Sequence, residues 1–179
     1  YKPATQTVFG EGPAGAAVVF VGEQPGDQED RQGRPFVGPA GRIFDQALAE
    51  AGIPRDRAYI TNAVKHFKFT PRGKRRLHKR PNAFEIDRCK WWLDRELALI
   101  RPRLTVALGA TAARALAGRP LAIGETRGRL FDLAPGLPGL VTVHPSSLLR
   151  VPDPEAKRLA YAAFVKDLAI AADALTLTG

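Results

Sequence analysis

Short apolar runs alternate along the chain with longer segments of helical periodicity. Four runs are rich in β-branched and other apolar side chains and have the length of buried strands. The predicted strands are 16–21, 58–61, 104–108 and 140–143, and the predicted helices are 40–51, 83–100, 110–116 and 155–175. On the helix 83–100 the predicted apolar side carries Ile86, Cys89, Trp92, Leu93 and Leu97. Strands that alternate with helices predict an α/β fold, with a parallel sheet covered on both faces.

Polar segments follow the carboxyl end of each predicted strand, where ligands collect in parallel sheets. They are residues 22–27, 61–66, 109–111 and 144–147, and they hold a carboxylate, amides, hydroxyls and a histidine. This set suits a nucleobase pocket, because amides read the Watson–Crick edge and a carboxylate manages protons. The alternative for each single segment is ordinary loop chemistry, in which Gly and Pro form turns and Ser and Thr cap helices. Four such segments together favour the pocket.

Composition narrows the class of protein. The 179 residues are 45% hydrophobic, which suits one domain spanning 1–179 with a real core. Lys and Arg number 27 against 18 acidic residues, a net charge of +9 that favours nucleic acid or another anionic partner. No apolar run is long enough for a membrane span, and a single cysteine allows no internal disulfide, so we expect a reducing, cytoplasmic setting. Because the sequence contains no Met, we expect that its translation start lies upstream of Tyr1.

The most basic stretch, residues 71–81, surrounds a single histidine with six cations. His78 lies in the sequence PRGKRRLHKRP. Such a dense positive charge indicates a polyanion as partner. It also disfavours protonation of the imidazole, so His78 is expected to keep a free lone pair near neutral pH. A neutral imidazole beside phosphates is a candidate nucleophile or base. The alternative is a solvated basic loop that contains an incidental histidine.

Five ordered motifs carry a resemblance. GEQPGDQED, GRPFVGPAGR, ITNAVKHF, KRRLH and VTVHPSS together resemble the uracil-DNA glycosylase superfamily, and within it the UdgX type, which is related to family 4. The resemblance covers nearly the whole chain from about Val8, and the KRRLH loop is the feature that separates the UdgX type from family 4. It implies a three-layer α/β/α sandwich around a four-stranded parallel sheet, which agrees with the strand pattern. The implied activity is excision of uracil from DNA.

The resemblance assigns a uracil pocket. Phe36 would stack on a flipped-out uracil, Asn62 would bind its edge and exclude cytosine, and His144 would contact O2 and stabilise the departing base. These roles suit the chemistry, because cleavage of the glycosidic bond leaves an oxocarbenium sugar and a uracil anion. Gln24 and Asp27 line the same pocket in the family pattern, and Gln24 is counted among the uracil-binding residues.

His78 matches the histidine that, in UdgX-type proteins, attacks the sugar in place of water and stays bonded to it. The product would be a stable protein–DNA adduct together with free uracil. Glu23 would orient this nucleophile or take its proton. The implied catalytic residues are His78, Glu23, His144, Gln24 and Asp27.

Contacts to the DNA are expected around this pocket. The predicted DNA-binding residues are Arg75, Arg76, Lys79, Arg80, Ser146, Ser147 and Arg150. Leu148, Leu149 and Arg150 resemble the segment that presses into the strand at the flipped site. The alternatives are generic surface solubility for the arginines and plain helix packing for the leucines. We expect single-stranded DNA to be the preferred substrate and the protein to be a monomer.

The metal expectation also comes from the resemblance. Related proteins carry a [4Fe–4S] cluster held by an N-terminal CxxC pair, a third ligand after the TN motif and a Cys on the following helix. His66 and Cys89 match the last two positions, with His replacing the Cys of family 4. The CxxC pair is missing, and we expect two further Cys upstream of Tyr1, because a cubane cluster needs four ligands. Without the resemblance, Cys89 would be a buried structural thiol.

Three functional hypotheses therefore stand. The first is a covalent uracil-DNA binder, and the second is a conventional glycosylase that turns over. The third is a non-catalytic module for single-stranded nucleic acid that uses Phe67, Phe69 and Trp91 as stacking surfaces. A dinucleotide-binding enzyme is disfavoured, because GEQPGD lacks the GxGxxG turn.

Overall fold

The computed structural model describes residues 3–176 and is built on one five-stranded sheet. The strand order is β2 (Tyr59–Asn62), β1 (Val18–Gly22), β5 (Leu104–Leu108), β7 (Leu137–Thr142) and β6 (Leu130–Ala134). The first four strands are parallel, as predicted, and β6 pairs antiparallel with β7 at the edge. The α/β fold is confirmed. The predicted strand count of four was wrong by this edge strand, LFDLA, in which only Leu133 is buried and Asp132 interrupts the apolar residues.

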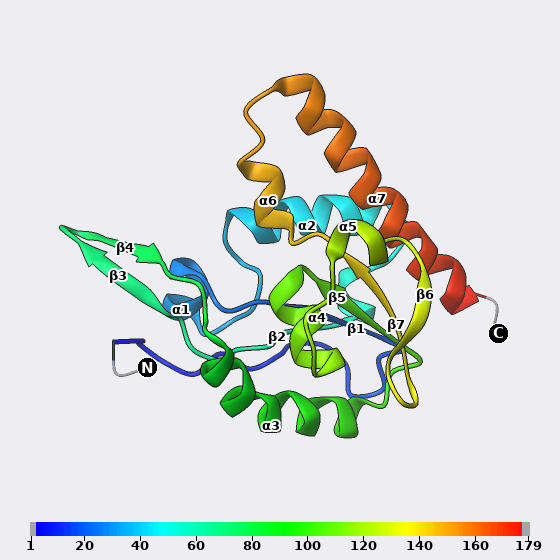
Figure 1. Cartoon of the computed structure of the whole chain (residues 1–179), viewed down its shortest axis with the longest axis horizontal. Coiled ribbons are helices and arrows are strands. Elements are labelled where there is room, and N and C mark those ends of the chain that lie inside the picture. The colour runs from blue at the N-terminus through cyan, green and yellow to red at the C-terminus, as the bar shows by residue number, and fades with distance from the viewer. Residues whose placement is uncertain (1–2, 177–179) are drawn as a thin grey trace.

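Helices cover both faces of the sheet and make the sandwich (Figure 1). α2 (Pro39–Glu50) and α7 (Pro154–Thr176) pack on one face, and α3 (Ala83–Ile100) and α4 (Ala110–Ala117) on the other. Because neighbouring residues of a strand point to opposite faces, Phe20 joins the apolar cluster under α2 and α7, whereas Val19 and Val21 join the cluster under α3 and α4. The shorter helices are α1 (Asp27–Gln32), the 3-10 turn Arg55–Arg57, α5 (Ile123–Thr126) and α6 (Pro145–Leu149).

The long helix α3 has the predicted bounds because both of its ends are marked locally. Asn82 caps its start by accepting a hydrogen bond from the backbone N–H of Glu85 at 2.9 Å. Arg101 ends it in the left-handed conformation. One part of the predicted apolar side was wrong: Trp92 is 44% exposed and packs edge-on against Phe9 and Trp91 instead of entering the core.

Residues 71–81, expected to form a loop, are largely a hairpin. β3 (Phe69–Arg72) pairs antiparallel with β4 (Arg75–His78), so that Phe69 lies opposite His78 at its base. Gly73 turns the chain at φ +60°, which glycine adopts without steric cost. The hairpin projects away from the sheet (Figure 1). Its strands are almost wholly exposed, so they lack the buried face that makes a strand visible in a sequence.

Within residues 3–176, no helix is both long and apolar enough to cross a membrane. The assignment of residues 1–179 to one domain stays a prediction.

Candidate active site

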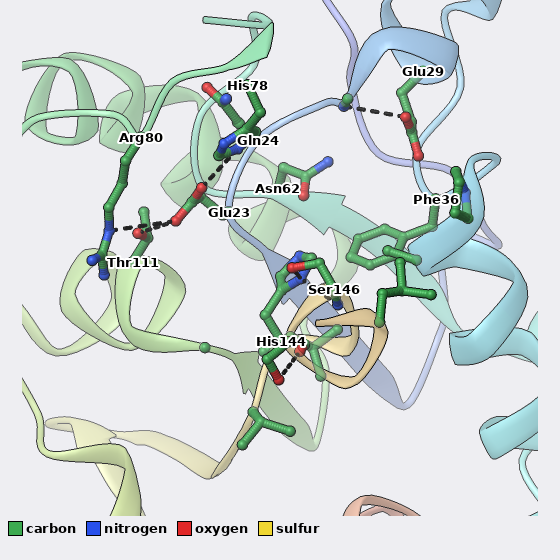
Figure 2. A pocket seen from close by; sticks show the side chains of 18 of the residues that line it. Glu23, Gln24, Glu29, Phe36, Asn62, His78, Arg80, Thr111, His144 and Ser146 are labelled. Carbon is green, nitrogen blue, oxygen red and sulfur yellow. Dashed lines mark hydrogen bonds and ion pairs between the residues drawn. The ribbon is translucent and has the colours of Figure 1, made fainter. Parts of the chain in front are cut away.

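The four polar segments predicted to converge do line one cavity of about 940 Å³ at the carboxyl ends of the parallel strands. This volume is at the upper end of the range of ligand pockets. The predicted site residues that line it are Glu23, Gln24, Asp27, Phe36, Asn62, His78, Arg80, His144, Ser146, Ser147 and Arg150. Figure 2 shows Asn62, Phe36 and His144 around one part of the cavity and Glu23, His78 and Arg80 around another. Arg75, Arg76, Lys79, His66 and Cys89 lie outside this lining.

Phe36 and Asn62 form an apolar wall with an amide beside it. Phe36 is 4% exposed, has a positive φ of 53°, and lies 5.8 Å from His144 in a stacked arrangement, centroid to centroid. A Cβ on Gly22 would lie 2.5 Å from both the Phe36 ring and Asn62 Oδ1, so only glycine at the end of β1 allows this approach. Gly22 therefore allows the Phe36 ring and the Asn62 amide to lie close to each other.

The loop that carries Phe36 is held by two residues to which sequence reasoning gave no role. Arg55 donates to the carbonyl oxygens of Pro35 at 2.9 Å and Phe36 at 3.2 Å. Glu29, 8% exposed, accepts a hydrogen bond from the backbone N–H of Gly38 at 3.0 Å. The contact of Glu29 spans nine residues and those of Arg55 span 19 and 20, beyond the reach of a single turn or cap, so the local sequence pattern did not reveal them.

His144 is a neutral donor aimed into the cavity. It is the N-cap of α6, and its Nδ1 accepts a hydrogen bond from the backbone N–H of Ser146 at 3.1 Å. Since Nδ1 accepts, the ring proton is on Nε2. Burial lowers the pKa of His144 to about 4 against the opposing effect of Glu23, so the ring is uncharged at neutral pH. A neutral Nε2–H can donate to a carbonyl oxygen and stabilise charge that develops on it.

Glu23 joins three residues at the other part of the cavity (Figure 2). Its Oε1 lies 3.0 Å from His78 Nε2, and its Oε2 accepts a 2.6 Å hydrogen bond from Thr111 Oγ1. Arg80 Nε lies 3.8 Å from Oε2. Burial raises the pKa of Glu23, but the hydrogen bonds from His78 and Thr111 lower it by more, so its pKa lies below the usual value. The carboxylate is therefore ionised and can act as a proton acceptor.

Thr111 had no assigned role in the sequence, although it lies in one of the converging segments. It is buried at 4% exposure near the start of α4, immediately after β5. A Thr near the start of a helix that follows a parallel strand is typical of helix capping, so the sequence did not indicate its side-chain partner. The structure shows that this hydroxyl donates to Glu23.

Gln24 and Asp27 both line the cavity, as predicted, and both also have partners within the protein. The Gln24 amide, predicted to bind uracil, instead donates to the carbonyl oxygens of Lys68 at 3.1 Å and Lys79 at 3.2 Å, and accepts from Lys68 N–H at 3.2 Å. It therefore fastens the base of the hairpin. Asp27 pairs with Arg31 and Arg76, and its predicted catalytic role stays a prediction. Burial raises the pKa of Asp27 and these arginines lower it by more, so the carboxylate is ionised.

Arg76 was predicted to bind phosphate, and the structure gives it another role. It pairs with Asp27 and with the fully buried Asp30, the latter at 2.6 Å. Its guanidinium also lies over the rings of Phe67 and Phe69, at 5.2 and 5.0 Å from their centroids. Arg76 is thus satisfied internally. Phe67 is 1% exposed, so it offers no stacking surface, which removes part of the support for a non-catalytic nucleic-acid module.

Some of the other predicted DNA-binding residues are exposed, whereas others have partners within the protein. Arg75 and Lys79 are exposed on the hairpin, and Arg80 and Arg150 are exposed at the cavity. Ser146 Oγ lies 2.8 Å from His144 Nδ1, and Ser147 Oγ donates to the His144 carbonyl at 2.8 Å, so both hydroxyls order α6. In the adjacent pair of leucines, Leu149 is 42% exposed, whereas Leu148 is 2% exposed and packs in the core. Leu148 therefore packs the helix against the core, which was the alternative interpretation of its sequence position.

The described residues do not supply the ligands of an iron–sulfur cluster. Within residues 3–176 no group of three or more His, Cys, Asp or Glu side chains is placed to hold a metal ion. Cys89 is 4% exposed within the apolar cluster under α3, and His66 Nε2 lies 2.9 Å from Thr7 Oγ1. A cubane needs four ligands, so these two residues do not form a cluster site by themselves.

Comparison with known proteins places this site in a family. Residues 9–169 match the Uracil DNA glycosylase superfamily. A type-4 uracil-DNA glycosylase of Thermotoga maritima is 40% identical over 156 residues, covering 87% of this chain and 78% of that protein. One of Pyrobaculum aerophilum is 34% identical over 159 residues, covering 85% and 78%. A DNA polymerase of Bacillus phage SP01 is 30% identical over 167 residues, 93% of this chain but 16% of the polymerase. With a family match over most of its length, the chain belongs to the uracil-DNA glycosylase superfamily.

Proposed function

We propose that this protein excises uracil from DNA and becomes bonded to the abasic sugar through His78. The observation that carries the proposal is the contact of His78 with an ionised Glu23 at the cavity lined by Asn62 and His144. Relatives named type-4 uracil-DNA glycosylases support the excision step. The UdgX type is supported by the KRRLH segment, which forms the turn and second strand of the hairpin.

The base would be expelled by groups that favour its anionic form. Uracil flipped from the strand packs on Phe36, and the buried Asn62 amide reads its edge. His144 donates its Nε2–H to O2 of the base, where negative charge develops as the glycosidic bond breaks. Because His144 is already neutral, it supplies this hydrogen bond without first losing a proton.

His78 then acts on the sugar. As the bond between C1′ and the base breaks, the base leaves with the electron pair and C1′ becomes electrophilic. A lone pair of the His78 imidazole bonds to C1′, and Glu23 takes up the imidazole proton. Thr111 holds the second carboxylate oxygen, so the first faces His78. The reaction yields free uracil and a protein–DNA adduct.

A conventional glycosylase is the second candidate, favoured by the similarity to type-4 enzymes. In that case water would take the place of His78 at C1′ and the protein would be released. The preference for single-stranded DNA, the monomeric state and the cytoplasmic location stay predictions. So does the [4Fe–4S] cluster, which needs two cysteines beyond those in this sequence.

One gel distinguishes the candidates. Uracil-containing single-stranded DNA is incubated with wild-type protein, and denaturing electrophoresis reveals adducts while alkali reveals abasic sites. We expect a heat-stable shifted band for wild type. His78→Ser should release uracil and leave an alkali-sensitive site without the band, because water can then reach C1′. His144→Ala should slow both uracil release and adduct formation by the equivalent of about 2.7–4 kcal/mol, the cost of losing one such donor.

Leu77→Ser is the matched control, because Leu77 is the exposed neighbour of His78 on the same strand. It should keep the shifted band. A band that persists in His78→Ser would exclude this residue as the nucleophile. Wild type that releases uracil with no band would favour the conventional glycosylase.

A further inference from the structure

The outer face of α3 carries a stripe in which aromatic and arginine side chains alternate. We name Phe84, Arg88, Trp91 and Arg95 the α3 stripe; their spacing of four, three and four residues puts them on one side of the helix. Phe84 is 62% exposed and Trp91 53% exposed. Arg88 lies over the Phe84 ring at 5.2 Å and Arg95 over Trp91 at 4.9 Å, measured to the centroids. The proposed glycosylase chemistry uses none of these residues.

The Trp91 ring of the stripe is held in place although it is exposed. Trp91 packs edge-on against Trp92 at 4.5 Å, and Trp92 in turn packs against Phe9 at 5.5 Å. With Arg95 on its ring, Trp91 is therefore restrained on more than one side. An ordered, exposed ring with a cation beside it loses little conformational entropy when a flat partner stacks on it.

The charge on the stripe is positive. Among residues 3–176, neither Arg88 nor Arg95 forms an ion pair. Two carboxylates, Asp87 and Asp94, lie on the flank of the same helix, and Asp94 is occupied by Lys90 at 2.7 Å. Unpaired guanidinium groups between exposed rings match an anionic chain that also presents flat bases. The same chemistry does not suit an apolar peptide.

The stripe begins close to the candidate active site. Arg80 lines the cavity, Pro81 is buried and Asn82 caps α3, so Phe84 follows within one turn of the helix start. Figure 1 shows α3 running from the base of the hairpin along the outside of the molecule. Phe84 and Trp91 are about 10 Å apart along the helix axis, about the length of three stacked nucleotides.

We infer that the α3 stripe is a second contact surface for single-stranded DNA, on which bases outside the catalytic cavity stack. This inference rests on the proposed function for the position of the strand in the cavity. DNA leaving the cavity passes Arg80 and continues along α3, with its bases on Phe84 and Trp91 and its phosphates near Arg88 and Arg95. A longer strand is therefore bound more tightly than one that only fills the cavity.

Tryptophan fluorescence tests the inference directly, because Trp91 and its neighbour Trp92 are the only two tryptophans of the chain. The probe is uracil-free oligothymidine of about 20 nucleotides, longer than a binding site of about 4–16 nucleotides, compared with a strand of about 5. We expect the long strand to quench the emission and to bind more tightly than the short one. Emission that does not change at saturating long strand would overturn the inference.

Variants separate stacking from charge. Trp91→Ala, followed by anisotropy of a labelled long strand, should bind about 5- to 150-fold more weakly, the range for one lost base stack. Arg88→Gln combined with Arg95→Gln should flatten the dependence of log affinity on log salt by up to about 0.7 per lost contact. Arg158→Gln, which removes an exposed charge from α7, is the matched control and should keep wild-type stacking and quenching. Thermal unfolding checks that each variant is folded.

Failure of the α3 stripe as a DNA surface can be distinguished from failure of the proposed glycosylase function. Uracil release from the short strand at saturation should be unchanged in the stripe variants, so loss of long-strand affinity with normal release supports the inference. Quenching and stripe-dependent affinity in a protein that never releases uracil would uphold the surface and reject the proposed function. Stripe variants that bind DNA normally but change the sedimentation of the free protein would overturn the DNA assignment in favour of contact between two copies.

Discussion

At the scale of the residue, the most informative group is the carboxylate of Glu23. Each of its oxygens has a partner, His78 on one and Thr111 on the other, and its side chain is 20% exposed. A carboxylate held on both sides cannot rotate freely, so its proton-accepting oxygen stays directed at the imidazole. In the proposed mechanism this restraint makes Thr111 a positioning residue, since it contacts Glu23 and would act on the reaction through it.

We predict that Thr111→Val slows adduct formation by about tenfold while uracil release stays close to wild type. Loss of a hydrogen bond to a charged group costs about 1.5–3 kcal/mol, and we take the lower end because Glu23 is partly solvated. The substitution keeps the shape of the side chain, and only the hydroxyl is lost. Timed gels measure both steps, and Thr111→Ser should restore adduct formation. Equal slowing of both steps would contradict a role confined to Glu23.

At the scale of the element, the hairpin β3–β4 delivers His78 from outside the sheet. Its strands bury little, so it is held by side chains at its base: Gln24 binds both of its ends and Arg76 ties it to α1. The position of His78, the proposed nucleophile, is therefore set by polar contacts between the hairpin and the body of the protein. An element held in this way can be loosened without disturbing the core.

We predict that Arg76→Gln detaches the hairpin. It leaves the buried Asp30 without its arginine, so the hairpin should open more often, trypsin should cut sooner at Lys74 and Arg75, and adduct formation should fall about tenfold or more. The salt dependence of DNA binding should not change, because Arg76 is satisfied within the protein.

Lys79→Gln serves as the comparison, because Lys79 is exposed at the base of the hairpin. It should flatten the salt dependence by about 0.7 and leave the hairpin resistant to trypsin. If Arg76→Gln flattened the salt dependence and left proteolysis unchanged, Arg76 would be a phosphate ligand after all.

At the scale of the whole molecule, a buried ion pair links α3 to the sheet beneath the site. Lys65 is 0% exposed and pairs with Glu96, and its ammonium also donates to the Thr61 hydroxyl and the Asn62 carbonyl. Glu96 further accepts hydrogen bonds from Tyr59 and from the backbone N–H of Gly10. The strand end that carries Asn62 is thereby joined to α3 and to the N-terminal segment.

We predict that Lys65→Met lowers the free energy of unfolding by about 3–5 kcal/mol, because it leaves the Glu96 charge buried without a partner. Lys65→Met combined with Glu96→Leu should recover part of this loss, since no uncompensated charge remains. Urea unfolding measures both. Glu85 lies on the same helix as Glu96, and Glu85→Gln, which breaks its half-buried pair with Lys68, should cost about 1 kcal/mol or less. A Lys65→Met loss no larger than that of Glu85→Gln would contradict the prediction.

Burial patterns made most of the sheet predictable. The strands β1 and β5 are buried along their whole length, so their apolar runs stand out, and α3 is bounded by a cap and a left-handed residue that act within a few positions. Once strands alternate with helices, parallel topology brings the strand ends to one edge, and the converging segments at Glu23, Asn62 and His144 follow from that. The hairpin strands are mostly exposed and gave no such signal, and the edge strand β6 buries only Leu133 fully.

The sequence by itself determined the α/β fold, the edge where polar groups gather and the motifs of the family. Tertiary structure decided which of those groups are free to act. Arg76 stands among six equivalent cations in sequence, and only the approach of Asp27 and Asp30 from another part of the chain removes it from the DNA-binding set. The amide of Gln24 and the hydroxyl of Thr111 likewise take partners more than 40 residues away. Hydrophobic periodicity records which face is buried, whereas the pairing of polar groups depends on contacts that exist only after the chain has folded.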